Sequence, residues 1–118
     1  MKLVVTLSVI VCAIASTVTA TPQQPVLTFK NIKPILDRRC VPCHGDSYPG
    51  GNLRLDSYEA LMKGGKHGKV VLPKNSAGSR LMKMVKGTVQ PRMPMDGQPL
   101  IQAEMERISK WIAQGAKK

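Results

Sequence analysis

The chain has 118 residues and a formal net charge of +11, from 18 Lys and Arg against 7 Asp and Glu. This length suits a single domain. No internal repeat is visible, so each sequence motif is expected to occur only once in the chain. The chain has one Phe, one Trp and two Tyr, and no base-reading module accompanies the positive charge, so nucleic-acid binding is not expected.

The first 20 residues have the pattern of a secretory signal peptide. A lysine at position 2 gives a positive start, Leu3 to Ile14 is mostly apolar, and Val18-Thr19-Ala20 is an acceptable cleavage site. The apolar stretch is short for a bilayer span, which needs about 20 residues. We therefore expect a signal peptide over residues 1–20 and a domain over residues 21–118, with an uncleaved membrane anchor as the alternative. Cys12 lies inside the signal segment and takes no part in the site.

A first helix is predicted from about Thr28 or Asn31 to Cys40, because apolar residues recur there at helical spacing. It leads directly into Cys40-Val41-Pro42-Cys43-His44. Two thiols three positions apart, followed at once by a histidine, form the attachment pattern of c-type haem. One helical turn brings both sulfurs to the vinyl edge of the porphyrin, and the imidazole then reaches the iron. Cys40, Cys43 and His44 are therefore predicted to bind one haem c, with His44 as the proximal iron ligand.

Three other kinds of site share the Cys-x-x-Cys spacing. A thioredoxin-like dithiol requires a strand before the motif and a βαβ pattern around it, whereas the preceding segment reads as helical. A structural zinc site needs four ligands, and His67 is the only further candidate once Cys12 is set aside. A disulfide between Cys40 and Cys43 would close a very short loop and would stabilise little. The motif therefore favours haem over these alternatives.

The rest of the chain alternates short helices with loops rich in glycine and proline, and no alternating strand pattern exceeds a few residues. The fold class expected is all-α, with about four short helices. A short helix is predicted from the capping sequence Asp56-Ser57-Tyr58-Glu59 to Met62 or Lys63. Another is predicted over 77–86, capped by Asn75 or Ser76 and stopped by Gly87. The last is an amphipathic helix over 100–114, closed by Gly115.

A methionine sulfur is a good second axial ligand for haem iron. Four of the seven methionines lie on predicted helices, where filling the core is their default role: Met62, Met82, Met84 and Met105. Met93 and Met95 lie instead in the loop over 88–99, which three prolines stiffen. Met93 is favoured as the ligand because prolines flank it on both sides at short range. Met95 and His67 stay open as alternatives.

Several segments resemble the small cytochrome c domain termed planctomycete-type. They are Ile32-Lys33-Pro34-Ile35-Leu36, Cys40 to Gly45, Gly51-Asn52-Leu53-Arg54-Leu55, Gly64-Gly65, Ser79-Arg80-Leu81, Arg92-Met93-Pro94 and Trp111 to Ala116. The resemblance implies a class I cytochrome c fold with one haem, in which the first and last helices cross and the helices wrap around the haem. It also implies that Met93, in the Arg-Met-Pro segment, is the distal ligand. In one departure, Gln98-Pro99 stands where the family often has a Ser or Asp cap before the last helix.

These expectations describe a periplasmic electron carrier with a single haem ligated by His44 and Met93. The alternative is a haem-based sensor or ligand-binding module with a labile sixth ligand. An enzyme is not expected, because no separate general acid or base stands out. The positive charge fits either a solvated surface or steering toward redox partners with acidic docking surfaces. We expect a monomer with no stable membrane insertion after signal cleavage.

Overall fold

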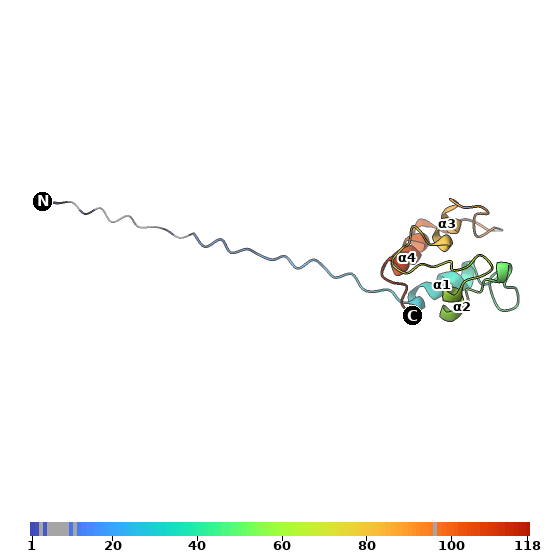
Figure 1. Cartoon of the computed structure of the whole chain (residues 1–118). Helices are drawn as coiled ribbons and strands as arrows, with labels where there is room; N and C mark the ends of the chain where they lie inside the picture. Colours follow the sequence, from blue (N-terminus) through green and yellow to red (C-terminus); the bar gives the residue numbers. More distant parts are fainter. Residues whose placement is uncertain (3, 5–9, 11, 96) are drawn as a thin grey trace.

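The computed structural model describes residues 1–2, 4, 10, 12–95 and 97–118. Residues 3, 5–9 and 11 of the predicted signal peptide, and Asp96 of the predicted proline-rich loop, lie outside the described residues. In the described part, an extended N-terminal segment leads into a helical domain (Figure 1). None of the helices found there combines the length and the apolar content that crossing a bilayer requires.

The described residues form four α-helices and one short 3-10 helix. In chain order these are α1 (Phe29–Arg39), η1 (Gly50–Asn52), α2 (Tyr58–Lys63), α3 (Arg80–Lys86) and α4 (Gln102–Ala113). No strand occurs among them, and the only sheet-like pairings in this part of the chain are isolated bridges such as that between Thr28 and Lys117. The all-α class predicted from the sequence is therefore confirmed.

The core lies where α4 packs against both α1 and α3. Ile32 and Leu36 of α1 and Ile108 and Ile112 of α4 are fully buried, as their helical spacing predicts. Trp111 is also fully buried; its Nε1 donates a hydrogen bond to the carbonyl oxygen of Lys117 at 2.8 Å. Trp111 is therefore a packing anchor that joins the last helix to the C-terminal segment.

Local hydrogen bonds determine the residues at which α2 and α3 begin. The Ser57 hydroxyl caps α2 by accepting from the amide of Ala60 at 3.2 Å, so the predicted short helix is confirmed. The predicted start of α3 at residue 77 is wrong. Asn75 closes a separate turn instead, because its Oδ1 accepts from the amide of Gly78 at 2.8 Å. Ser79, which is buried, is the residue that precedes α3.

The last helix also begins later than predicted, at Gln102 rather than residue 100. Leu100 is buried, and Ile101 is extended, with φ −70° and ψ 157°. The Ile101 amide donates to Oε2 of Glu104 at 3.2 Å, which satisfies one of the free amides at the helix start. Leu100 thus packs in the core just before α4 begins, and Glu104 supplies a side-chain bond at the helix start.

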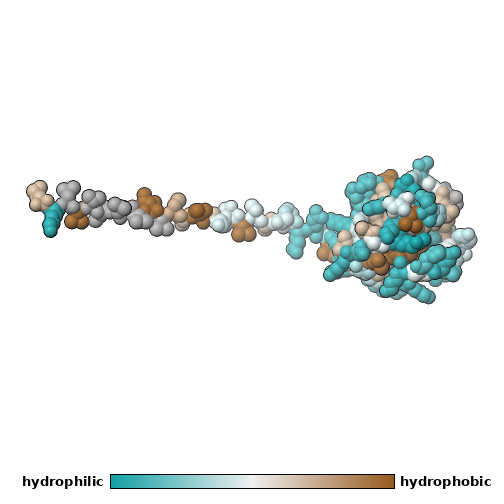
Figure 2. Space-filling view, turned by 45° about the horizontal axis from the view of Figure 1, so that its top comes forward, coloured by the Kyte–Doolittle hydropathy of each residue, from teal (hydrophilic) through white to brown (hydrophobic). Residues whose placement is uncertain are grey.

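The two ends of the domain are held together by backbone and side-chain hydrogen bonds. The amide of Phe29 donates to the carbonyl of Lys117 at 2.8 Å, and the amide of Leu27 donates to Oε1 of Gln114 at 2.7 Å. Figure 1 accordingly shows the C-terminus beside the point where the N-terminal segment enters α1. The face of the domain seen in Figure 2 is mostly hydrophilic, with small apolar areas between polar side chains.

Candidate cofactor site

Cys40, Cys43 and His44 lie in one turn that continues α1, here termed the attachment turn (residues 40–44). The amide of Cys40 still donates to the helical carbonyl of Leu36, at 2.8 Å. The amides of Cys43 and His44 then both donate to the carbonyl of Cys40, at 3.1 and 2.8 Å. Both cysteines are free thiols. The turn therefore presents two sulfurs and an imidazole from neighbouring positions, as the motif predicts.

The His44 ring is held by a backbone carbonyl. Its Nδ1 lies 3.2 Å from the carbonyl oxygen of Leu53. A carbonyl oxygen can only accept a hydrogen bond, so Nδ1 is the donor, and in the neutral form of the ring Nε2 keeps its lone pair. Metal-ligating histidines have this arrangement, in which a hydrogen bond to one ring nitrogen orients the other toward the metal. This contact therefore leaves Nε2 as the ring nitrogen that is available to a metal ion.

The loop that follows His44 returns to the attachment turn and packs closely on it. The amide of Gly50 donates to the carbonyl of Cys43 at 2.9 Å, and the amide of Leu55 donates to the carbonyl of His44 at 2.7 Å. A Cβ at Gly50 would come within 2.9 Å of the Cys43 carbonyl oxygen and 3.3 Å of Cε1 of His44. Only glycine therefore fits beside the imidazole at this position.

Two ion pairs brace the same loop from outside. The Arg54 guanidinium lies 2.9 Å from a carboxylate oxygen of Asp46 and 2.7 Å from one of Asp56. The hydrogen bond from Arg54 lowers the pKa of the Asp56 carboxyl below its ordinary value. Arg54 follows directly after Leu53, so these pairs help to fix the carbonyl that orients His44.

The two thiols of the motif differ in environment. Burial raises the pKa of the Cys40 thiol from its ordinary value of 9.0 to about 11, so Cys40 is a neutral thiol near pH 7. Cys43 is exposed. The sulfur at the helix end is thus sheltered by the core, whereas the second sulfur is open to solvent.

Met93, the predicted distal ligand, lies in a separate loop that connects α3 to α4, here termed the methionine loop (residues 88–99). Its amide donates to the carbonyl of Met84 at 3.0 Å, and its side chain is partly buried against the core. Met95 is 64% exposed. Among the residues that the structure describes, no hydrogen bond joins Met93 to His44. The structure therefore groups the three motif residues and places Met93 on a different segment.

His67, the other open alternative, is exposed in a tight turn from Gly65 to Gly68. That turn packs on the loop that holds His44: the amide of Lys66 donates to the carbonyl of Gly51 at 3.0 Å. The described residues contain no group of three or more His, Cys, Asp and Glu side chains that could hold a metal ion, so that part of the chain offers no conventional zinc site.

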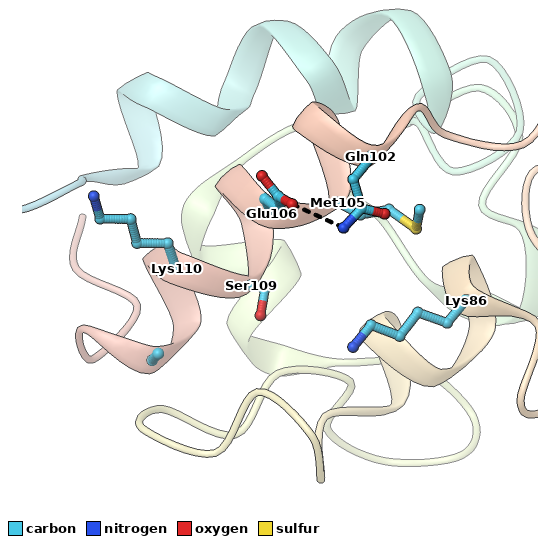
Figure 3. Close-up of a pocket in the computed structure, with 7 residues that line it drawn as sticks. Lys86, Gln102, Met105, Glu106, Ser109 and Lys110 are labelled. Atoms are coloured by element: carbon cyan, nitrogen blue, oxygen red, sulfur yellow. Dashed lines mark hydrogen bonds between the residues drawn. The ribbon is translucent and has the colours of Figure 1, made fainter.

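A pocket of about 410 Å³ lies between α3 and α4, apart from the residues of the motif (Figure 3). Its polar edge includes Lys86 of α3 and Lys110 of α4, and Nε2 of Gln102 donates to Oε1 of Glu106 at 2.8 Å. None of the predicted site residues lines it. The attachment turn, by contrast, holds the donor set that a haem c requires: two free thiols in one turn and an imidazole whose Nδ1, rather than Nε2, meets a carbonyl.

Sequence reasoning missed the backbone and side-chain partners that complete the site. The carbonyl of Leu53 orients His44, and Arg39 bonds to the carbonyls at the end of the methionine loop. A backbone carbonyl leaves no signal in the sequence. An arginine next to the motif is visible there, but the chain gives no indication of which distant group it contacts.

Comparison with protein-family models gives one match that covers the site. Residues 40–97 match the family described as Planctomycete cytochrome C. The matched segment begins at Cys40 and includes both His44 and Met93. No match was found among curated proteins or among solved structures.

Proposed function

We propose that this chain, which contains a cytochrome c-type domain of the planctomycete family, transfers single electrons between redox partners. It does so through one covalently bound haem c, whose axial ligands are His44 and Met93. When bound, the haem supplies an iron that gains and loses one electron. The observation that carries the proposal is the His44 ring, whose Nδ1 bond to Leu53 leaves Nε2 free beside two free thiols. In this proposal the domain has the class I arrangement, with α1 and α4 packed together and the haem held beside them.

The roles of the motif residues follow from their positions. Cys40 and Cys43 form the two thioether bonds, which keep the cofactor on the chain outside the cell. His44 provides Nε2, and the Leu53 carbonyl both orients the ring and makes Nε2 a better donor. The bonds from Gly50 and Leu55 hold the turn in place, so the imidazole needs little rearrangement when the charge on the iron changes.

Three contrasts support Met93 over its alternatives as the sixth ligand. Met93 is partly buried and tied to α3 through Met84, so its sulfur can be held in one place. Met95 is 64% exposed. His67 is exposed, and its turn packs on the same loop that holds His44, whereas Met93 would bring a ligand from a separate segment.

The proposed setting is the periplasm, with residues 1–20 as the signal peptide and a monomeric carrier as the product. Without residues 1–20, which include Lys2, the chain keeps 17 Lys and Arg against 7 Asp and Glu, a net charge of +10. This charge supports redox partners with acidic docking surfaces, because opposite charge raises the rate of encounter. The proposal assigns no catalytic residue to the chain. A test of this part is the salt dependence of electron transfer to an acidic and a basic redox protein, with faster transfer to the acidic one expected at low salt.

The ligand set is tested by visible and near-infrared spectra of the protein produced in a bacterium that attaches haem. The ferric wild type is expected to show the weak near-infrared charge-transfer band of methionine ligation. Met93→Ala should lose this band, while Met95→Ala, the matched control in the same loop, should keep it. A band that persists in Met93→Ala would overturn the ligand assignment. Ready carbon monoxide binding by the reduced wild type would instead favour a sensor with a labile sixth position.

A further inference from the structure

Arg39 connects the end of α1, next to the attachment turn, to the methionine loop. It is the last residue of α1 and directly precedes Cys40. Its Nη2 donates to the carbonyl oxygen of Gln98 and, at 3.2 Å, to that of Pro99. These partners lie 59 and 60 residues away along the chain. The contact therefore joins two segments that the backbone alone does not bring together.

The methionine loop depends on such outside donors because it is rich in proline. Proline has no N–H group, so a loop with three prolines has fewer internal hydrogen bonds with which to fix its own carbonyls. The start of the Met93–Pro99 segment is tied to α3 by the bond between the Met93 amide and the Met84 carbonyl, at 3.0 Å. The end of the segment is tied to α1 by Arg39. Met93 and the pair Gln98-Pro99 are thus each held by a contact with a helix.

From this geometry we propose that Arg39 is a positioning residue for the sixth ligand: it holds the methionine loop against the attachment turn and so keeps the Met93 sulfur at the iron. The inference rests on the proposed function, because it concerns the ligand assigned there. Arg39 touches neither reacting atoms nor ligand, and it acts only through the carbonyls of Gln98 and Pro99. Loss of these bonds would let the loop move away and make Met93 easier to displace.

The neighbouring arginine provides a matched control. Arg38 lies in the same helical turn and carries the same charge, but its Nη2 faces Oε1 of Glu104 at 3.6 Å. Its side chain is 62% exposed. Arg38 therefore contacts α4 rather than the methionine loop. Replacing either arginine by methionine removes one positive charge next to the motif, so a difference between the two variants reports on the loop contact and not on charge.

A lysine at position 39 gives an intermediate case. The planar guanidinium can donate to two carbonyls at once, whereas an ammonium is a point charge on a flexible chain. Arg39→Lys keeps the charge but is expected to hold the two neighbouring carbonyls less firmly. The order of loop stability expected is wild type, then Arg39→Lys, then Arg39→Met.

The test uses the haem-loaded protein and follows the near-infrared band as the pH is raised, until another group displaces methionine. Arg39→Met is expected to lower the midpoint pH of band loss by about one unit, which corresponds to roughly a tenfold shift in the balance between bound and displaced ligand. Carbon monoxide should bind reduced Arg39→Met roughly tenfold faster, because methionine must first leave. Arg38→Met should match the wild type in both measurements, and Arg39→Lys should lie between.

The outcomes separate this inference from the ligand assignment. If the wild type shows the band and Arg39→Met titrates like Arg38→Met, the role of Arg39 is overturned and Met93 ligation stands. If the wild type lacks the band, or if Met93→Ala keeps it, the ligand assignment fails and this inference fails with it. If Arg39→Met yields no haem-loaded protein, Arg39→Lys decides: an unchanged midpoint overturns the inference, and a lowered one supports it.

Discussion

An alanine at Gly50 tests how tightly the loop packs on the attachment turn. Its Cβ would lie 2.9 Å from the Cys43 carbonyl oxygen and 3.3 Å from Cε1 of His44. The carbonyl cannot move away freely, because it accepts the Gly50 amide at 2.9 Å. Overpacking of this kind costs about 2 kcal/mol. In a domain of this size that loss lowers the melting temperature by roughly 10 °C.

Gly51→Ala is the matched control. Gly51 has φ +63°, so alanine is strained there by about 1 kcal/mol. A Cβ at Gly51 meets no atom within 4 Å, so it does not reach His44. Thermal unfolding should therefore show that both variants are destabilised. The ring-proton signals of His44, shifted by the ferric iron, should move in Gly50→Ala and stay in place in Gly51→Ala. Unmoved His44 signals in Gly50→Ala would refute the close packing described here.

Three further predictions concern the core, the thiols and the acid limit. Trp111→Ala should lower the free energy of unfolding by about 3–5 kcal/mol in urea titrations, because the side chain is fully buried; a loss below about 1 kcal/mol would contradict this. In the reduced, haem-free protein, iodoacetamide should label Cys43 well before Cys40. The Cys40 pKa, raised from 9.0 to about 11, leaves about 100-fold less Cys40 thiolate than the ordinary pKa would. Equal labelling of the two cysteines in peptide mass spectra would count against the burial of Cys40. Arg54 lowers the pKa of the Asp56 carboxyl from its ordinary value of 3.8, so this pair stabilises the fold fully above pH 3.8 and less as the pH falls through the lowered pKa. Asp56→Asn should therefore weaken the dependence of the free energy of unfolding on pH below about 4. An unchanged dependence would disprove the coupling.

The sequence predicted the elements whose signals are local. The helical spacing of Ile32 and Leu36 indicated α1, and the stripe with Trp111 indicated α4, because a buried face repeats every three to four residues. Ser57 and Gly87 marked the start of α2 and the end of α3, since a cap depends only on nearby backbone. The attachment motif was visible for the same reason: its three residues belong to one turn.

The start of α3 was not predicted, because it depends on which of several nearby polar residues makes a turn before the helix, and helical spacing does not decide this. Ser79 is buried, and its hydroxyl accepts from the amide of Leu72 at 2.9 Å and donates to the carbonyl of Asn75 at 2.8 Å. These bonds hold the residues before Ser79 in a turn, so the helix begins after Ser79 rather than at residue 77. The bond between Arg39 and the methionine loop is hidden for a different reason: its partners lie 59 and 60 residues away, and contacts across the fold follow from the assembled structure rather than from spacing.

The most direct test of the central claim is intact and peptide mass spectrometry of the protein exported by a bacterium that attaches haem. The account predicts a chain heavier by the mass of one haem, with the added mass on the peptide that contains Cys40 and Cys43. A colourless, folded protein with unmodified cysteines would contradict it.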